Sequence, residues 1–275
     1  MSDPTRATFA QLQASINQQI VGQPALVQRM MRALLCDGHL LLEGAPGLAK
    51  TRAIKSLAAG VEADFHRIQF TPDLLPADLT GSDIYHPEDG SFRFNHGPLF
   101  HNLILADEIN RAPAKVQSAL LESMEERQVT IGSTSHPLPD LFLVMATQNP
   151  IEQEGTYPLP EAQLDRFLLH VRIGYPDRAA SKQILALSRQ ETLDSLEQTT
   201  TVITEQLTQQ QLFNARRAVI ALHLAESVED YIIELVEATR NPQAYGEPLS
   251  RWLQWGASPR GAIAIERAAR ATAWL

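Results

Sequence analysis

The apolar run His39-Leu40-Leu41-Leu42-Glu43 is followed directly by the loop Gly44-Ala45-Pro46-Gly47-Leu48-Ala49-Lys50-Thr51, and together they decide the fold. The run predicts a buried strand, and a helical pattern begins at the end of the loop. In such an arrangement the backbone N–H groups of the loop wrap a phosphate chain, and the helix adds its positive N-terminal end. Lys50 would then reach the β- and γ-phosphates of a nucleotide, and the Thr51 hydroxyl would ligate Mg²⁺. The loop therefore predicts ATP and Mg²⁺ as ligands.

One residue of the loop departs from the strict phosphate-binding motif, which has glycine where this chain has Ala49. Alanine adopts the backbone angles that the start of a helix requires. We therefore expect the change to restrict the backbone conformations open to the loop without preventing the fold. The alternative is a glycine turn before a helix that binds no ligand. The strand before the loop and the helix after it disfavour that alternative.

Two further apolar runs end in side chains suited to the same ligand. Residues 103–106 are followed by Asp107 and Glu108, and residues 141–145 lead to Asn149. Adjacent carboxylates at the end of a buried strand cost free energy unless they serve a cation or a reaction. We expect Asp107 to hold Mg²⁺ through its water shell and Glu108 to activate the attacking water as general base. Asn149 would contact the γ-phosphate and this water.

Each of these end-of-strand motifs has a plainer interpretation. Asp107 and Glu108 could face solvent and cap the following helix, and Asn149 with Pro150 could form only a turn that ends a strand. The phosphate loop upstream of both motifs favours the interpretation as one nucleotide site.

Apolar runs alternate with helical patterns over the first two thirds of the chain. This alternation predicts an α/β fold whose parallel sheet is covered on both faces. We also expect two inserted hairpins, at about 82–94 around Asp89-Gly90 and at about 128–137 around Gly132. The runs that predict strands are 39–43, 65–70, 103–106, 141–145 and 168–171.

The character of the sequence changes after Pro176. A helix over about 177–189 should lead into a polar linker at 191–201, and the remainder predicts helices. Accordingly, we divide the chain into a nucleotide-binding core at 1–190 and an all-α domain at 191–275. Because the last helical pattern is still running at Leu275, we expect a C-terminal piece of this second domain to be absent. The expected helix starts are a Thr208/Gln211 capping box, Ser227 with Asp230, and Ser258-Pro259.

Composition excludes several classes of protein. The net charge of −9 argues against binding to nucleic acid, and the single cysteine, Cys36, excludes an internal disulfide. No apolar run approaches the roughly 20 residues of a membrane-spanning helix, and the N-terminus has no pattern of a secretory signal. We therefore expect a cytoplasmic protein with no membrane span and no nucleic-acid partner.

Together these motifs resemble the AAA+ superfamily, and their order resembles the MoxR family of AAA+ ATPases in particular. The resemblance covers nearly the whole chain, from about Gln18 to Leu275, and alanine at position 49 is familiar in this family. The stretches that carry the resemblance are IVGQ (20–23), EGAPGLAKT (43–51), ADEINRA (106–112), ATQNP (146–150), LPEAQLDRF (159–167) and GASPR (256–260).

The resemblance implies an AAA+ αβα core with a five-stranded parallel sheet, followed by an all-α lid. In that fold the strand of Asn149 lies between the strands that carry the phosphate loop and Asp107. The turn Val21-Gly22 would seat the adenine. The first hairpin resembles an insertion in the second core helix, and the second resembles the hairpin that precedes the sensor strand.

Two arginines gain a role only through the resemblance. It implies that Arg166 is an arginine finger reaching the nucleotide of a neighbouring subunit, and that Arg260 is a second sensor contacting the γ-phosphate. Whether Arg260 acts on its own subunit's nucleotide or on a neighbour's stays open. From the residues alone, Asp165-Arg166 and Pro259-Arg260 are more typical of surface ion pairs and helix starts.

As to function, the resemblance implies a hexameric ring that hydrolyses ATP and remodels protein clients as a chaperone, with von Willebrand factor A domain partners. The alternatives are a nucleic-acid motor, the motor subunit of a metal chelatase, and a nucleotide-binding scaffold without turnover. Aromatic residues of the first hairpin, Tyr85 and Phe92 among them, are expected to pack locally, with a grip on a client as the alternative. Trp252 and Trp255 are expected in the lid core or in its contact with the first domain.

Overall fold

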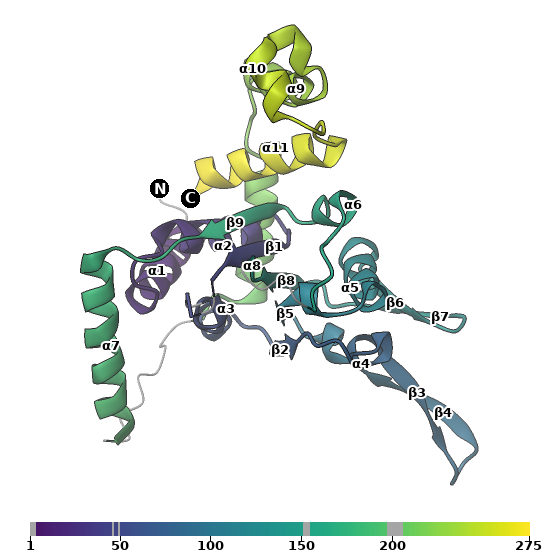
Figure 1. The fold of residues 1–275 in the computed structure, drawn as a ribbon. Helices are drawn as coiled ribbons and strands as arrows, with labels where there is room; N and C mark the ends of the chain where they lie inside the picture. Colours follow the sequence, from purple (N-terminus) through teal and green to yellow (C-terminus); the bar gives the residue numbers. More distant parts are fainter. Residues whose placement is uncertain (1–3, 46, 49, 151–154, 197–205) are drawn as a thin grey trace.

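The central feature is a sheet of five parallel strands in the order β2-β5-β8-β1-β9 (Figure 1). The structure is a computed structural model that describes residues 4–45, 47–48, 50–150, 155–196 and 206–275. The predicted α/β fold with a five-stranded parallel sheet is confirmed. The strands are β1 Leu40–Gly44, β2 Phe65–Gln69, β5 Leu103–Asp107, β8 Leu143–Gln148 and β9 Leu169–Ile173.

Both faces of the sheet are covered, because side chains alternate between the faces along each buried strand. Leu40 and Leu42 belong to one hydrophobic cluster, whereas Leu41 belongs to another. The helices that contribute to the first cluster are α1 Pro4–Gln19, α2 Pro24–Leu35, α3 Lys50–Ala59, α8 Gln209–Ile220 and α11 Pro259–Trp274. Those that contribute to the second are α4 Pro76–Thr80 and α5 Ala114–Glu126, with the short helices η1 Pro98–Phe100 and η2 Ile109–Arg111.

Both predicted hairpins are confirmed, and they project from the same side of the molecule (Figure 1). The ring of Phe94 in the first stacks on His136 in the second, with centroids 4.0 Å apart. In the first hairpin, the exposed rings of Tyr85 and Phe92 pack on each other, with their centroids 5.2 Å apart. The hairpin strands are β3 Gly81–His86, β4 Ser91–His96, β6 Gln128–Ile131 and β7 Thr134–Pro137.

The helix after β9 is longer than predicted. This helix, α7, spans Arg178–Leu196, so the predicted linker at 191–201 is helical over its first six residues. The reason is local: Glu191-Thr192-Leu193-Asp194-Ser195-Leu196 contains neither glycine nor proline, and an uninterrupted backbone continues the helix. The rest of the predicted linker, 197–201, lies outside the described residues.

The remaining helices are α9 Glu226–Arg240, η3 Pro242–Tyr245 and α10 Glu247–Trp252, with α6 Glu161–Leu164 before β9. The predicted Thr208/Gln211 capping box and the Ser258 start of α11 are confirmed. The N-cap predicted at Ser227 is wrong by two residues, because α9 begins at Glu226 with Ala225 as an N-cap that makes no side-chain bond.

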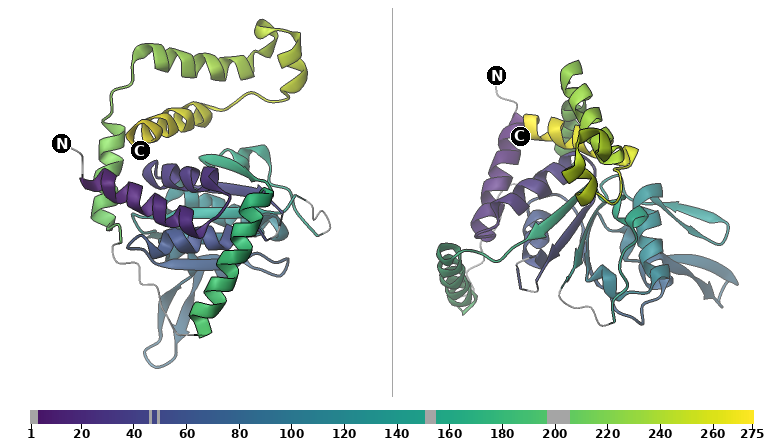
Figure 2. Two further views of the ribbon diagram at one scale, coloured as in Figure 1. Left: turned by 90° about the vertical axis from the view of Figure 1, so that its left-hand side faces the viewer. Right: turned by 45° about the horizontal axis from the view of Figure 1, so that its top comes forward.

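The expectation for the two tryptophans is also wrong. Trp252 is 79% exposed and Trp255 is 68% exposed. Helical spacing misled the prediction, because α10 ends at Trp252 and the next residue, Leu253, is extended, so the two rings share no helix face. The segment with α9 and α10, in yellow-green, stands away from the sheet (Figures 1 and 2).

Other parts of the C-terminal region join the core directly. Phe9 of α1 and Trp274 of α11 meet edge to face with centroids 5.2 Å apart. Leu212 of α8 is fully buried in the same cluster. Within the described residues, no helix combines the length and the apolar character that crossing a membrane requires.

Candidate active site

The carboxyl edge of the sheet gathers the predicted nucleotide residues. Since the strands are parallel, Gly44 at the end of β1, Asp107 at the end of β5 and Asn149 just after β8 all lie at this edge. The strand β8 lies between β5 and β1, which confirms the predicted place of Asn149 between the phosphate loop and Asp107. Asn149 is 6% exposed, so it is buried at this edge.

Within the described part of the phosphate loop, Gly47 has an unusual backbone conformation. Gly47 has φ +80°, a left-handed angle that glycine adopts without strain, and a Cβ added there would meet no atom within 4 Å. The backbone at this position therefore leaves room for a ligand such as a phosphate group. Two residues of the loop, Pro46 and Ala49, lie outside the described residues. Two others, Ala45 and Leu48, are buried.

Lys50 begins α3 and turns back over the loop. Its Nζ donates a hydrogen bond to the Gly44 carbonyl oxygen at 2.8 Å. Burial lowers the pKa of the Lys50 ammonium, and the negative charges of Asp107 and Glu108 oppose that shift. Since Gly44 ends β1 and Asp107 ends β5 at the same edge of the sheet, both acids lie on the side of the sheet where Lys50 begins α3. Thr51 follows Lys50 in the first turn of α3.

A small cavity of about 80 Å³ adjoins the loop at the predicted adenine position. Val21 lines it together with Gly47 and Leu48, and α7 supplies Ile184 and Leu187. Gly22 has φ +80°, and a Cβ there would come within 2.8 Å of Ala180 in α7. The turn predicted to seat the adenine therefore lies beside the phosphate loop and under α7.

The two acids at the end of β5 are fixed by different partners. Asp107 accepts a hydrogen bond from the Thr147 hydroxyl at 2.6 Å through Oδ1 and one from Arg67 Nη2 at 2.7 Å through Oδ2. Glu108 has a left-handed backbone with φ 58°, and its N–H donates to Thr147 Oγ1 at 2.9 Å. Such a conformation costs about 1–3 kcal/mol in a non-glycine residue, and strain of this kind is typical of functional sites.

The Glu108 carboxylate is also engaged. Its Oε2 accepts a hydrogen bond from Gln69 Nε2 at 3.0 Å and pairs with Arg111 Nε at 2.9 Å. Sequence reasoning missed Gln69, Arg67 and Thr147. The signal for the first two was present, since Arg67 and Gln69 alternate with buried Ile68 and thus place two polar side chains on one face of β2.

The two predicted arginines lie at the opposite edge of the sheet. Arg166 precedes β9, and Arg260 is in the first turn of α11. Both pair with Glu125 near the end of α5: Arg166 Nη2 lies 3.0 Å from Oε2, and Arg260 Nη2 contacts Oε1. Asp165 lies 3.5 Å from Arg260 Nη1 and accepts a hydrogen bond from Ser258 at 2.6 Å. The fold thus gathers the two arginines around one carboxylate.

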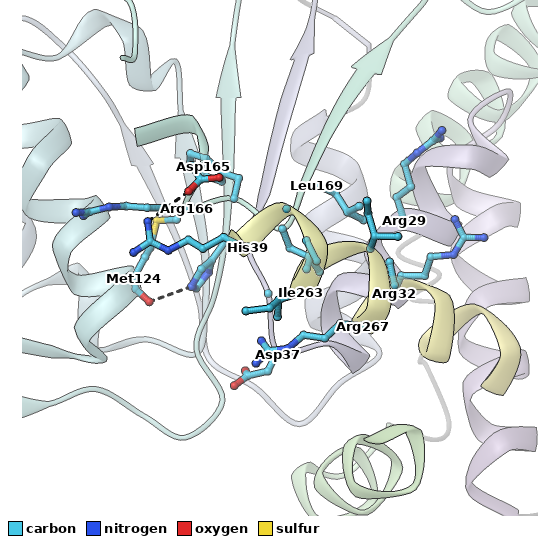
Figure 3. A pocket seen from close by; sticks show the side chains of 18 of the residues that line it. Arg29, Arg32, Asp37, His39, Met124, Asp165, Arg166, Leu169, Ile263 and Arg267 are labelled. Atoms are coloured by element: carbon cyan, nitrogen blue, oxygen red, sulfur yellow. Dashed lines mark hydrogen bonds and ion pairs between the residues drawn. The ribbon is translucent and has the colours of Figure 1, made fainter. Parts of the chain in front are cut away.

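These arginines line a cleft of about 910 Å³ between the amino edge of the sheet and α11 (Figure 3). His39 and Leu169, at the amino ends of β1 and β9, line its floor. A five-residue strand such as β1 is about 16 Å long, so this edge lies roughly that far from the phosphate loop. Because both guanidinium groups pair with Glu125, Arg166 and Arg260 lie at the amino edge, away from the phosphate loop.

His39 anchors the cleft to the core. Its Nδ1 accepts a hydrogen bond from the Val144 N–H at 3.1 Å, and its Nε2 lies 3.4 Å from the Met124 carbonyl oxygen. Burial lowers the pKa of His39 to about 4, and the positive charge of Arg127 adds to that shift. Because Met124 precedes Glu125, a neutral His39 ties β8 to the end of α5 that holds both arginines.

Comparison with known proteins agrees with this geometry. Residues 39–169 match the profile described as "ATPase family associated with various cellular activities (AAA)". Chaperone MoxR1 of Mycobacterium tuberculosis is 46% identical over 255 residues, covering 92% of this chain and 66% of that protein. Protein MoxR of Paracoccus denitrificans is 32% identical, covering 98% of this chain and 82% of that protein. The chain belongs to the MoxR family of AAA+ ATPases.

A solved structure supports the same assignment for this MoxR-family chain. The crystal structure of a protein from Cytophaga hutchinsonii, described as a candidate ATPase, superimposes with a TM-score of 0.86 at 45% identity. That match covers 98% of this chain and 81% of the other. Against MoxR1, however, the chain spans just under two thirds of the relative's length, 66%.

The residues at the carboxyl edge of this MoxR-family chain fit Mg·ATP. The open backbone at Gly47 and the ammonium of Lys50 suit a triphosphate. Asp107 offers carboxylate oxygens, the ligand type that Mg²⁺ prefers, and Thr51 stands at the position of the metal-ligating hydroxyl. Asn149 and Glu108 follow the neighbouring strands β8 and β5 at the same edge.

Proposed function

We propose that this MoxR-family protein hydrolyses ATP at sites shared between neighbouring subunits of a ring. The observation that carries the proposal is the separation of two groups: Lys50, Asp107 and Glu108 lie at one edge of the sheet, and Arg166 and Arg260 at the other. In a head-to-tail ring the arginine edge of one subunit would face the nucleotide edge of the next. Each interface would then hold one complete site.

Each residue has a defined task in this proposal. Lys50 and the loop amides bind the phosphates, and the carboxylate of Asp107 orients the hydrated metal, which neutralises charge on the phosphate oxygens when bound. Glu108 accepts a proton from the attacking water, whose position Asn149 fixes. Arg166 of the neighbour stabilises the charge that develops on the transferred phosphate.

Arg260 is proposed to act in the same interface as Arg166. Its pairing with Glu125, which also holds Arg166, supports a role toward the neighbour's nucleotide rather than its own. Because Arg260 lies at the start of α11, which contacts α9, binding to that nucleotide would shift α9 and α10, whereas α8 and the end of α11 stay packed in the core. We propose that residues 191–275 contribute this lid and that the division from the core falls after α7, which continues to Leu196, rather than at residue 190.

We base the proposed cellular role of the ring on the names of related proteins. One relative carries the name chaperone, and we extend that role to this chain as remodelling of protein clients in the cytoplasm. A hexamer and von Willebrand factor A domain partners complete the proposal. The hairpins are without clusters of Lys and Arg, and the net charge is −9, so neither supports a nucleic-acid substrate.

The first test compares Lys50→Ala with Glu108→Gln. Lys50→Ala should abolish binding of a fluorescent ATP analogue, because the loop loses its cation. Glu108→Gln should bind ATP normally and hydrolyse it about 10²–10⁴-fold more slowly, since it lacks the base. Fluorescence titration, steady-state phosphate release and mass measurement of the ATP-bound assembly provide the readouts.

Three results would contradict the proposal. ATP binding retained by Lys50→Ala would remove the assignment of the phosphate loop. Near-normal hydrolysis by Glu108→Gln would require another base. Hydrolysis by the wild-type chain that rises with added DNA, and loses that rise steeply with salt, would favour a nucleic-acid motor instead. If the ring is correct, the ATP-trapped Glu108→Gln assembly is also the form in which to look for a bound client.

A further inference from the structure

The carboxylate predicted to face the metal is already occupied by a cation of the protein. Arg67 donates to Asp107 Oδ2 twice, from Nη2 at 2.7 Å and from Nε at 3.2 Å. The other oxygen, Oδ1, accepts the Thr147 hydroxyl at 2.6 Å. Among the described contacts, therefore, both oxygens of Asp107 have a partner, and one of these partners is a full positive charge.

Arg67 is held in this position by a second contact. Its Nη2 also donates to Gln69 Oε1 at 2.9 Å, and Gln69 Nε2 donates onward to Glu108 Oε2 at 3.0 Å. Arg67 and Gln69 are two residues apart on β2, so both side chains emerge from the same face of the strand. One strand thus supplies a partner for each of the two acids at the end of β5.

The pair is placed so that it can open. The strand β2 is at the edge of the sheet, and the side chain of Arg67 is 47% exposed, whereas that of Asp107 is 13% exposed. A half-exposed ion pair contributes little to folding stability, because water solvates the arginine nearly as well. The Thr147 contact differs, since a neutral hydroxyl can remain on Oδ1 while a metal's water shell uses Oδ2.

We propose that Arg67 competes with Mg²⁺ for Asp107 and thereby sets the Mg²⁺ concentration at which this subunit binds ATP. The inference rests on the proposed function, because it takes Asp107 as the residue that faces the metal. Two cations cannot share Oδ2 at close range without strong repulsion, so Mg·ATP binds as the guanidinium moves off the carboxylate into solvent. Arg67 is in this sense a residue that determines metal affinity rather than a catalytic residue.

The test is a Mg²⁺ titration of nucleotide binding in the full chain. A fluorescent, non-hydrolysable ATP analogue is added at fixed concentration, and binding is followed from excess EDTA to millimolar Mg²⁺. Arg67→Gln should lower the half-saturating Mg²⁺ about 2- to 5-fold, the upper part of the range expected for one partly screened ion pair. Arg67→Lys, which keeps the charge but offers one donor group in place of two, should shift it less. The affinity in EDTA should change less than about twofold.

The matched control is Arg111→Gln. It removes the same charge from the same edge, but Arg111 pairs with Glu108 instead of Asp107. Direct competition predicts that this control shifts the half-saturating Mg²⁺ by less than twofold. Equal shifts in Arg67→Gln and Arg111→Gln would mean that the loss of any positive charge near the site changes the Mg²⁺ affinity. That result would overturn the proposal.

The remaining outcomes also decide the question. An unchanged Mg²⁺ dependence in Arg67→Gln overturns the proposal, as does weaker analogue binding in EDTA, which would make Arg67 a phosphate ligand. Failure of the proposed function appears differently, as no analogue binding by the wild-type chain or as equal binding by Lys50→Ala. Thermal unfolding of each variant, compared with Arg93→Gln at the distant Asp89 pair, shows whether a variant is folded.

Discussion

The two edges of the central sheet carry opposite halves of the proposed chemistry. The carboxyl edge carries a glycine loop, a lysine and two acids, which we propose bind ATP and its metal. At the amino edge, two arginines share Glu125, and a cleft of about 910 Å³ opens beside them. Neither edge is a complete site for phosphoryl transfer, and this difference is the structural argument for a ring.

The edges also differ in how they are built. The carboxyl edge follows from the ends of neighbouring strands, so short pieces of sequence determine most of it. The amino edge joins α5, the segment before β9, and α11. Arg260 and Glu125 are separated by 135 positions along the chain. Variants can therefore test the two halves separately, and the mixing of variants can test whether they act across an interface.

The largest expected effect is that of Arg166→Ala. Hydrolysis should fall about 10³–10⁵-fold, the usual contribution of an arginine finger, while ATP binding stays close to normal. Mixing Arg166→Ala with Lys50→Ala should restore part of the activity, because some interfaces would combine an intact arginine with an intact loop. Steady-state ATPase assays over a series of ratios measure this. If no ratio restores activity, Arg166 either acts on the nucleotide of its own subunit or is not an arginine finger.

Arg260→Ala should have the next largest effect. We expect a loss of about 10²–10³-fold in hydrolysis, the cost of removing one donor from a site of developing charge. Rescue by Lys50→Ala in the same mixing assay would assign Arg260 to the neighbour's nucleotide. The control is Arg251→Ala, which removes a lid arginine from an exposed pair with Glu247 and should leave activity unchanged. Activity lost without rescue would favour action within one subunit.

The pH dependence of stability tests the anchoring of the amino edge. The folded pKa of His39, about 4, lies below the unfolded value of 6.5, so the unfolded chain takes up a proton first as the pH falls. The contribution to the free energy of unfolding is therefore fully present above pH 6.5 and is lost as the pH falls toward 4, by roughly 3 kcal/mol.

The measurement is urea unfolding of the wild type and of His39→Gln at pH 7 and at pH 4.5. His39→Gln should be less stable at pH 7 but should lose less stability on acidification, because its side chain does not titrate. Parallel losses in both proteins would show that other groups control the acid response.

The residues of the carboxyl edge could be predicted because they occur in short contiguous motifs. Gly44–Thr51 and the Asp107-Glu108 pair each follow an apolar run, and a parallel sheet brings the ends of such runs together. Arg166 and Arg260 came only from the resemblance to a family, since an arginine at a helix start is common on any surface. Arg67 was missed because residues 65–70 were interpreted only as a strand, without use of the alternation of polar Arg67 and Gln69 with apolar Ile68.

The wrong predictions share a cause with the missed residues. Helical spacing placed Trp252 and Trp255 in a core, but the helix ends between them, and where a helix ends depends on what it packs against. The same local reasoning ended α7 too early. In both cases the sequence predicted a helix correctly but placed its end at the wrong residue.

By itself, the sequence determined the class of fold, the phosphate loop and the acids that face it, because backbone periodicity and short motifs act over a few residues. Only the tertiary structure decided that Arg166 and Arg260 meet on Glu125, that they do so at the edge away from the loop, and that Arg67 covers Asp107. The physical reason is that these are contacts between distant segments, whose geometry depends on how helices pack on the sheet and leaves no periodic trace in the chain.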